Sequence, residues 1–175
     1  KKLNNVHMIN VSWKEGWRGI LNAHFWMKNQ FSSYLGNFES GGGALQEHSH
    51  GLHIFNLILK NYKIHLKKIK FNSNIFYLYK KNHKYDYYSS IVGNYKKIFF
   101  KYETDLISEP AKKEISISSN RIKIDLIFNY KDQFDAVIIT KKNKNKLVKL
   151  FKKTRSTDFE NEIKDLLKFY KKRNY

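Results

Sequence analysis

One short stretch of the chain gathers the side chains that most often hold a metal ion. Glu47, His48, His50 and His53 lie within seven residues, shortly after three glycines at 41–43. Imidazole nitrogen and carboxylate oxygen suit zinc or iron, and on a strand His48 and His50 would point to the same side. The alternative is a polar loop that leaves a glycine-rich turn. We favour the loop and predict no metal site and no cofactor; His48, His50 and His53 are the candidate ligands if a metal binds.

Two short motifs resemble families of ligand-binding β-barrels. Gly42, followed by five residues and then His48-x-His50, resembles the opening of the first cupin motif, although 52–59 lacks the glutamate that should follow. Residues 16–19 read Gly-Trp-Arg-Gly and resemble the Gly-x-Trp near the N-terminus of lipocalins. These resemblances imply a closed lipocalin-like or cupin-like barrel that binds a small ligand or a metal. We keep this as the alternative function.

Motifs for catalysis are missing from the sequence. Asp125 and Asp135 precede Lys141, as in nucleases that hold a divalent ion between two carboxylates, but 136–140 carries no second acid for the ion. The chain has no Walker loop, dinucleotide fingerprint, Gly-x-Ser-x-Gly or His-Glu-x-x-His motif. It also has no cysteine, which excludes thiolate metal sites and cysteine nucleophiles. We therefore expect that the protein is not an enzyme.

Basic residues interleaved with tyrosines recur along the middle of the chain. Lys and Arg number 34 against 15 Asp and Glu, which gives a formal net charge of +19. Lysines neutralise phosphates and exposed tyrosines stack on unpaired bases, so this pattern favours RNA binding. The alternative is that the tyrosines face a core while the lysines are solvated. The predicted RNA contacts are Lys60, Lys63, Lys67, Lys68, Lys70, Tyr77, Tyr79, Lys80, Lys81, Lys96, Lys97, Lys141 and Lys142.

The amino-acid composition suggests one origin of the positive charge. Lys, Asn, Ile, Phe and Tyr are abundant while Ala and Pro are scarce, which is typical of an AT-rich genome and accounts for part of the lysine excess. We predict a noncatalytic RNA-binding structural protein, a constituent of an organellar (mitochondrial) ribosome or similar ribonucleoprotein particle. Its partners would be structured RNA, with rRNA favoured, and neighbouring proteins of a large assembly. The expected location is the mitochondrial matrix, otherwise the cytoplasm.

A third interpretation is a structural subunit of a large protein assembly, whose aromatic side chains face partner chains. No apolar stretch approaches the ~18 residues that a bilayer span requires. The sequence alone does not decide between this interpretation and RNA binding.

The elements that must position these residues form a single predicted domain over 1–175. Segment 1–43 is rich in Trp and Phe and ends in the glycine-rich break; a strand near 6–11 and a helix over 17–31 are expected there. From 53 to 141, short apolar runs alternate with turn residues about every ten positions, which predicts an antiparallel meander. The expected strands are 53–59, 62–70, 74–80, 85–91, 95–103, 113–118, 121–129 and 134–140.

The clearest predicted elements are a hairpin and the C-terminal helix. Residues 114–118 and 121–125 alternate isoleucine with polar residues around a two-residue loop, which pairs Ile117 with Ile122 and Ile115 with Ile124. Over 156–173, apolar residues recur at helical spacing as one stripe. We therefore predict an α+β fold: an antiparallel curled sheet or partly open barrel of about 7–8 strands, an irregular Trp-rich N-terminal segment, and a C-terminal amphipathic helix packed on the sheet.

Overall fold

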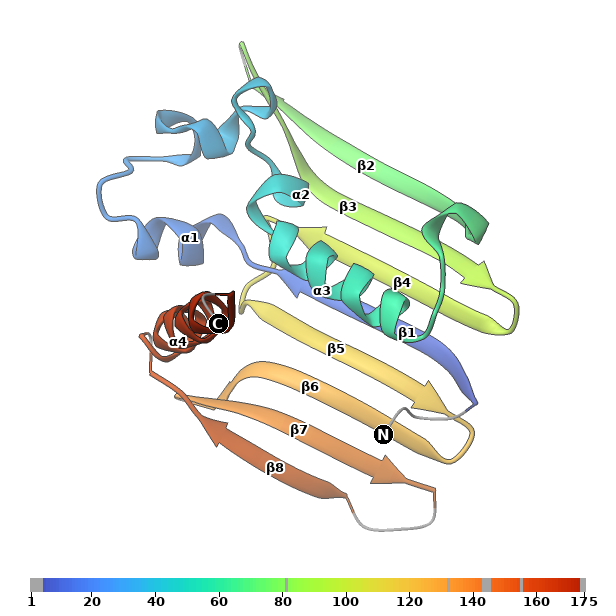
Figure 1. The fold of residues 1–175 in the computed structure, drawn as a ribbon. Helices are drawn as coiled ribbons and strands as arrows, with labels where there is room; N and C mark the ends of the chain where they lie inside the picture. The colour runs from blue at the N-terminus through green and yellow to red at the C-terminus, as the bar shows by residue number, and fades with distance from the viewer. Residues whose placement is uncertain (1–4, 81, 132, 143–145, 155, 174–175) are drawn as a thin grey trace.

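A computed structural model of the chain describes residues 5–80, 82–131, 133–142, 146–154 and 156–173. In this part of the chain, eight strands form one open sheet in the order β2-β3-β4-β1-β5-β6-β7-β8 (Figure 1). The strands are β1 (Val6–Lys14), β2 (Lys70–Lys80), β3 (His83–Tyr95), β4 (Ile98–Asp105), β5 (Lys112–Ser119), β6 (Ile122–Lys131), β7 (Phe134–Lys141) and β8 (Leu147–Lys152). The helices are α1 (Trp17–Ala23), α2 (Ala44–Glu47), α3 (Ser49–Asn61) and α4 (Thr157–Arg173), with four 3-10 helices, η1 (Gln30–Ser32), η2 (Tyr34–Gly36), η3 (Phe38–Ser40) and η4 (Leu66–Lys68).

Strand β1 lies at the centre of this sheet, although it comes from the segment that was predicted to be irregular. It pairs in parallel with β4 and antiparallel with β5, so that Val11 lies between Tyr102 and Ile115. Ile9 and Val11 are almost fully buried, as expected of β-branched residues on the inner face of a central strand. The sheet is therefore mixed, and the prediction of an antiparallel meander is wrong at its centre.

The sheet does not close on itself. β2 and β8 are its two edges and lie at opposite ends of the strand order. Both edge strands are exposed along nearly their whole length. The prediction of a curled or partly open barrel is therefore wrong, and with it the closed lipocalin-like or cupin-like plan.

Helix α3 stands where a strand was predicted over 53–59. Its buried residues Gly51, Phe55 and Leu59 recur every four positions, which is the period of a helix face rather than of a strand. Dense apolar runs such as 54–59 fit both periods, and neighbouring residues decide between them. The segment predicted as a strand over 62–70 is mostly turn and η4.

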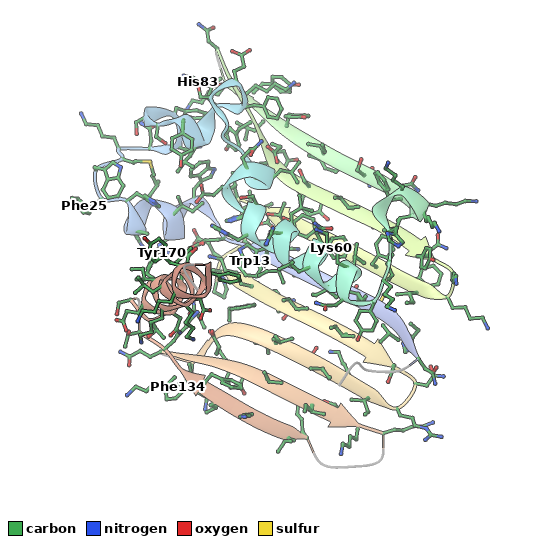
Figure 2. All side chains as sticks on the ribbon, viewed as in Figure 1. Trp13, Phe25, Lys60, His83, Phe134 and Tyr170 are labelled. Carbon is green, nitrogen blue, oxygen red and sulfur yellow. The ribbon has the colours of Figure 1, made fainter. Side chains whose placement is uncertain are left out.

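Glycine at position 51 allows α3 to lie directly on β1. A Cβ at Gly51 would lie 2.6 Å from the Cβ of Trp13, which is closer than real atoms approach. Trp13, labelled in Figure 2, belongs to the main core cluster together with Ile9, Phe55 and Phe100. This cluster fills the space between α3 and the middle of the sheet.

The predicted helix over 17–31 ends at Ala23. Further along, the side chains of Asn29, Ser33 and Asn37 each accept a hydrogen bond from the backbone N–H two residues on. Side chains of this kind compete with the helix for backbone donors, so the chain forms the three short turns η1 to η3 instead. A second core cluster, which includes Leu35, lies beneath them.

The predicted hairpin is confirmed, with a corrected register. β5 and β6 are antiparallel neighbours, but Ile117 pairs with Ile124 and Ile115 with Leu126. The Ser119 hydroxyl accepts a hydrogen bond from the N–H of Ile122 at 3.1 Å, which widens the turn. Because the shift is two residues, each isoleucine keeps the face that was predicted for it.

The C-terminal helix is confirmed as α4, but its predicted packing on the sheet is wrong. Every described side chain from 159 to 171 is exposed. The apolar stripe includes Leu166 at 64% and Tyr170 at 69% exposure (Tyr170 is labelled in Figure 2). No helix in the described ranges combines the length and apolar character needed to cross a membrane.

Candidate active site

The candidate site lies at the carboxyl ends of the parallel strands. Among the described strands, β1 and β4 are the parallel pair, and they end side by side at Lys14 and Asp105. Open sheets with parallel strands bind ligands outside the carboxyl ends of those strands. In this protein, α2 and the first turn of α3 cover that edge (Figure 1).

A glycine-rich turn fixes where α2 begins. Gly43 has φ +109°, a backbone conformation that favours glycine, and a Cβ there would collide with Asp86 Oδ1. Asp86 Oδ2 accepts hydrogen bonds from the Leu45 N–H at 2.9 Å and from the Ser89 hydroxyl at 3.1 Å. Burial raises the pKa of Asp86. Gly42 and Gly43 are thus buried in a packed turn, whereas Gly41 is exposed.

His48 lies between α2 and α3 and points into the protein. It is 3% exposed, and its Nε2 donates to the Asp105 carbonyl at 3.0 Å. The Tyr102 hydroxyl donates to the His48 carbonyl at 3.3 Å. Burial, followed by the nearby charge of Lys113, lowers the pKa of His48. A neutral His48 therefore ties the helix junction to the end of β4.

Glu47 is the titratable group whose surroundings suggest chemistry. It is half-buried, and burial raises the pKa of its carboxyl group. The charges of His24, Lys113 and His50 act in the opposite direction, whereas the charge of Glu15 raises that pKa further. Glu47 therefore keeps its proton to a higher pH than an ordinary carboxyl group, which suits a general acid or base.

The groups around Glu47 come from four separate segments. Glu15 follows β1, His24 follows α1, Lys113 is on β5 and His50 is in the first turn of α3. Lys113 Nζ donates to Glu15 Oε2 at 2.6 Å, so these two charges neutralise each other. His50 is exposed, which leaves its imidazole open to a ligand.

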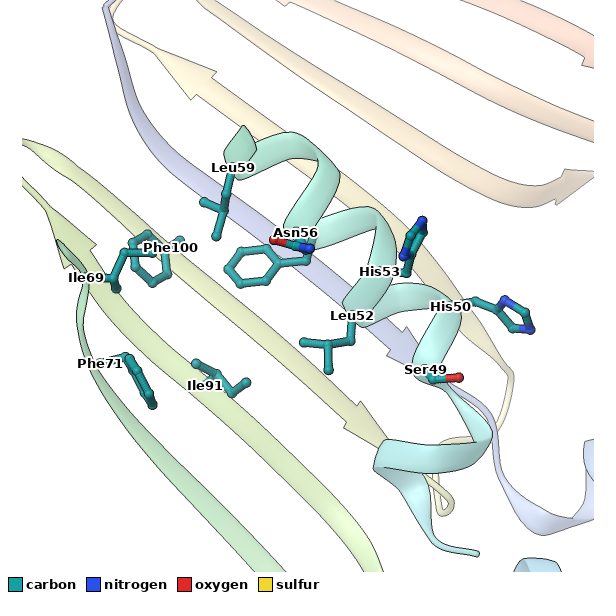
Figure 3. Close-up of a pocket in the computed structure, with 11 residues that line it drawn as sticks. Ser49, His50, Leu52, His53, Asn56, Leu59, Ile69, Phe71, Ile91 and Phe100 are labelled. Carbon is teal, nitrogen blue, oxygen red and sulfur yellow. The ribbon is translucent and has the colours of Figure 1, made fainter. Parts of the chain in front are cut away.

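His50 also lines a cavity of about 790 Å³ beside α3, which we call the α3 pocket (Figure 3). The pocket extends from the first turn of α3 along the helix and over strands β2, β3 and β4. In Figure 3 the His50 ring points away from Leu52, Ile91 and Phe71, and Glu47 is not among the residues that line the cavity. The acid–base pair and the apolar cavity therefore lie on different sides of α3.

The structure places the predicted RNA-binding lysines in separate regions. One set lies where α3 leads into β2 and where β3 turns into β4: Lys60, Lys63, Lys67, Lys68, Lys70, Lys96 and Lys97. Tyr77, Tyr79 and Lys80 lie at the other end of β2, Lys141 and Lys142 lie at the end of β7, and Lys81 is outside the described residues. The described lysines of this set are all exposed.

The two tyrosines lie beside Lys84, and Tyr79 is largely exposed. Lys84 Nζ lies 4.1 Å from the ring centroid of Tyr77 and 5.5 Å from that of Tyr79. The same lysine lies 6.0 Å from the Phe38 ring. Cation–π contacts of this kind hold the rings of β2 against η3.

The histidine cluster is helical, and its members diverge. His48 is buried at the helix junction, whereas His50 and His53 are exposed on α3. Within the described residues, no group of three or more histidines, aspartates or glutamates is arranged to hold a metal ion. The strand geometry that would have aligned His48 with His50 is therefore wrong.

No protein-family model and no curated protein matches the sequence. Solved structures do share the fold. A 3-ketoreductase from Actinomadura kijaniata in complex with NADP and TDP-benzene is 7% identical, with 86% of this chain and 42% of that chain covered and a TM-score of 0.57. An inositol dehydrogenase homolog from Azotobacter vinelandii in complex with NAD+ is 9% identical, with 86% and 37% covered and a TM-score of 0.56.

An oxidoreductase from Pseudomonas syringae is also similar, at 8% identity and a TM-score of 0.50, with 83% of this chain and 34% of that chain covered. The chain therefore spans between about a third and about two fifths of the length of these enzymes. At such low identity the likeness concerns the fold: a mixed, mostly antiparallel open sheet that oxidoreductases contain.

These likenesses contradict the predicted function. The similar structures are oxidoreductases, two of them with a nicotinamide nucleotide bound, whereas a ribosomal or other ribonucleoprotein constituent was predicted. The predictions that the protein is RNA-binding, is not an enzyme, and has structured RNA and assembly proteins as partners are therefore wrong, as is the third interpretation as a structural subunit. The lysine content led to the wrong prediction, because lysine frequency depends on genome composition as well as on what a protein binds.

The described residues do not fit a nicotinamide dinucleotide. Its pyrophosphate binds where a parallel strand turns into a helix through glycines with free N–H groups. At the turn from β1 into α1, the Gly16 N–H donates to the Ser108 carbonyl at 2.7 Å and the Trp17 N–H donates to the Leu106 carbonyl at 3.1 Å. A Cβ at Gly16 would also lie 2.9 Å from the Glu109 side chain. The nucleotide would have to be held by another domain or chain.

Sequence reasoning noticed Glu47 and His50 but assigned them to a polar loop, with metal binding as the alternative, and it missed Glu15, His24 and Lys113. Glu47 ends α2 and His50 lies in the first turn of α3, so the break between the two helices, rather than one helical period, brings them together. Nothing local connects the other three, since the fold brings them in from distant segments.

Proposed function

We propose that this chain is the substrate-binding part of an oxidoreductase that interconverts a secondary alcohol and a ketone. In this proposal Glu47 and His50 handle the proton on the reacting oxygen. The observation that carries it is the half-buried Glu47, whose pKa is raised, beside the exposed imidazole of His50 and the Glu15–Lys113 ion pair. The names of two similar structures, a ketoreductase and an inositol dehydrogenase, support this class of reaction.

The chemistry requires such a pair. Oxidation of an alcohol removes a proton from its oxygen, and reduction of a ketone delivers one. A carboxyl group with a raised pKa holds that proton to a higher pH than an ordinary carboxyl group, and imidazole is the side chain that most often transfers protons in enzymes. A nicotinamide nucleotide held outside the described residues would supply the redox chemistry.

Protein isolated from its natural source tests the proposal, because any nucleotide-binding partner is retained. We expect NAD+- or NADP+-dependent oxidation of secondary alcohols, measured as absorbance of the reduced nicotinamide. Glu47→Gln and His50→Gln should each lower kcat by about 10²-fold or more. Matched controls are Glu160→Gln on exposed α4 and His65→Gln before η4, which should leave kcat unchanged.

The pH profile separates the two roles from a loss of folding. If Glu47 is the acid–base group, residual activity of Glu47→Gln should lose the acidic limb of the kcat profile, while His50→Gln keeps it. Full activity in both variants, or no nicotinamide-dependent turnover of any secondary alcohol, would refute the proposal.

A further inference from the structure

Helix α4 presents a stripe of apolar side chains to solvent. Four of its residues, which we call the α4 stripe, are between 57% and 69% exposed: Phe159, Ile163, Leu166 and Tyr170. Figure 1 shows α4 beside the ends of strands β5 to β8 rather than along the face of the sheet. Exposed apolar patches of this kind mark interaction sites.

The spacing of the α4 stripe fits a second helix. Its residues follow one another at intervals of four, three and four positions, which is the seam along which two helices pack in a coiled coil. Leu167 and Phe169, at 55% and 73% exposure, widen the apolar surface on its two sides. The α4 stripe therefore suits a helix as its partner.

The charges of α4 are divided along its length, and this division indicates which helix fits. Residues 157–162 contain three acidic residues and no basic residue, whereas 166–173 contains four basic residues and no acidic residue. A second α4 that runs in the opposite direction would place each acidic half beside a basic half, and the two helix dipoles would also be opposed. A second α4 in the same direction would bring like charges together. The charge pattern therefore favours an antiparallel second copy.

One register satisfies the apolar seam and the charges together. In this register Phe159 packs against Tyr170 of the second copy and Ile163 packs against its Leu166, and each contact occurs twice. Glu160 and Lys171 are both exposed. They are separated by about three helical turns, so they border the α4 stripe on the same side. The antiparallel arrangement then brings Glu160 of each copy beside Lys171 of the other.

The antiparallel direction also separates two strongly basic molecules. Each chain has a formal net charge of +19, so two copies repel each other when their sheets are close. In an antiparallel pair the strands that lead into the two helices lie at opposite ends, about 25 Å apart for a helix of 17 residues. This separation exceeds the Debye length of about 8 Å at physiological ionic strength, so the repulsion is largely screened.

We propose that two copies of this chain associate through an antiparallel pair of α4 helices. The sheet takes no part in the contact, so each copy folds by itself and the pair forms as the concentration rises. Two helices of this length bury less area than a standard interface, and we expect a dissociation constant of about 10–100 μM. The inference is independent of the proposed function, because no residue of α4 takes part in the proposed proton transfer.

Sedimentation equilibrium of the purified chain, over concentrations from about 1 to 500 μM, tests the association. The mass should rise from 21.0 kDa toward twice that value. Ile163→Asp places a charge in the α4 stripe and should keep the chain monomeric, and its exposed position spares the fold. Asn161→Asp adds the same charge away from the stripe on the same helix and, as the matched control, should associate normally. Circular dichroism confirms that both variants are folded.

Charge reversal tests the direction of the pair. Glu160→Lys and Lys171→Glu should each weaken the association about 2- to 10-fold, because the reversed contact occurs twice. The variant that combines both changes should recover most of the affinity. In a parallel pair each residue would face its own counterpart, so combining the two changes would recover nothing.

Cysteine cross-linking reports the direction independently, because the chain has no cysteine of its own. Phe159→Cys and Tyr170→Cys chains are mixed, oxidised at high concentration and analysed by mass spectrometry. An antiparallel pair should give the disulfide between the two different chains. Disulfides between identical chains would overturn the antiparallel arrangement.

Two results of the sedimentation experiment would overturn the inference. Association that survives Ile163→Asp would belong to another surface of the molecule. A chain that stays monomeric at every concentration would leave α4 without a second copy. In that case a lower Tm of Ile163→Asp would place the stripe on the sheet of its own chain, and binding to vesicles of phosphatidylserine and phosphatidylcholine would place it on an anionic membrane.

Discussion

At the scale of single residues, the charge on Glu47 works against folding. Burial raises the pKa of Glu47 above its ordinary value of 4.5, so the folded protein binds this proton more tightly than the unfolded chain does. Stability from this group is therefore complete below about pH 4.5 and is lost as the pH rises through the raised pKa.

Glu47→Gln should accordingly raise the Tm at pH 7 and leave it unchanged at pH 4, where Glu47 is protonated in both states. Thermal unfolding followed by circular dichroism at the two pH values measures this. Glu160→Gln, exposed on α4, should change neither value. A lower Tm for Glu47→Gln at pH 7 would mean that His24, Lys113 and His50 stabilise the carboxylate more than burial penalises it.

His48 predicts the opposite dependence on pH. Its pKa in the folded protein is lowered from 6.5 by burial, so the unfolded chain binds the proton more readily. Stability is full above about pH 6.5 and is lost as the pH falls toward the folded-state pKa. Between pH 7 and pH 5.5, the Tm of His48→Gln should fall less than the Tm of the natural protein. At pH 7 the substitution should lower the free energy of unfolding by about 1 kcal/mol, because the hydrogen bond from His48 to Asp105 is lost.

The control for this experiment is His65→Gln, an exposed imidazole outside the helix junction. Its Tm should follow the natural protein at both pH values. Parallel curves for the natural protein and His48→Gln would contradict the structural role of a neutral His48.

Part of the candidate site could be predicted from sequence, and the limits are physical. Glu47 and His50 stand out because several histidines and a glutamate, which can transfer protons or bind metals, follow shortly after three glycines. Their geometry depends on whether the segment is a strand or a helix, and an apolar run as short as 54–59 fits both. The raised pKa of Glu47 depends on burial and on charges from other segments, which no local pattern encodes.

At the scale of elements, Gly51 sets the distance between α3 and β1. Gly51→Ala places a methyl group 2.6 Å from Trp13 Cβ, and neither backbone can yield without moving the helix. We expect a loss of about 1–3 kcal/mol in the free energy of unfolding, measured by urea denaturation. Lys60→Ala, exposed on the same helix, should stay within about 0.5 kcal/mol; an equal effect of both would show that α3 does not press on β1.

The register of the β5–β6 hairpin can be tested with engineered disulfides, because the chain has no cysteine of its own. Ile117→Cys combined with Ile124→Cys places the two residues directly opposite each other, within the Cα separation that a disulfide spans. Ile117→Cys with Ile122→Cys is displaced by two residues and should not close. Oxidation followed by mass spectrometry of peptides decides between them, and closure of the second pair would restore the register predicted from the two-residue loop.

Elements with strong local patterns were predictable, whereas those defined by distant partners were not. Alternating isoleucines predicted the hairpin, and a stripe at helical spacing predicted α4. The strand β8 was missed because Lys149 and Lys152 made its segment resemble a charged linker. The central place of β1 depends on β4 and β5, which lie about ninety or more residues further along the chain.

At the scale of the whole molecule, some of the excess lysines lie on the two edge strands of the sheet. Lys70 and Lys80 lie on the edge strand β2, and Lys149 and Lys152 lie on the edge strand β8, all of them exposed. Charged edges discourage an open sheet from pairing with another copy. The formal charge of +19 thus fits a protein with two uncovered edges. The single domain over 1–175 and the mitochondrial location stay predictions.

Removal of α4 tests how independent the sheet is. Because every described side chain from 159 to 171 is exposed, deletion of 157–175 should change the free energy of unfolding by less than about 1 kcal/mol. Urea denaturation of the shortened and complete chains measures this at equal protein concentration. A loss of several kcal/mol would show that the apolar stripe of α4 is packed against the protein in solution.

The central position of β1 also affects how the chain matures during translation. Residues 6–14 leave the ribosome before both of their partner strands, which are complete only after residue 119 has been added. The β2–β3 hairpin and α3 can form during that interval, because their contacts are local. Until β4 and β5 emerge, Ile9, Val11 and Trp13 form an unpaired apolar strand that holdase chaperones can bind and that neighbouring nascent chains can capture.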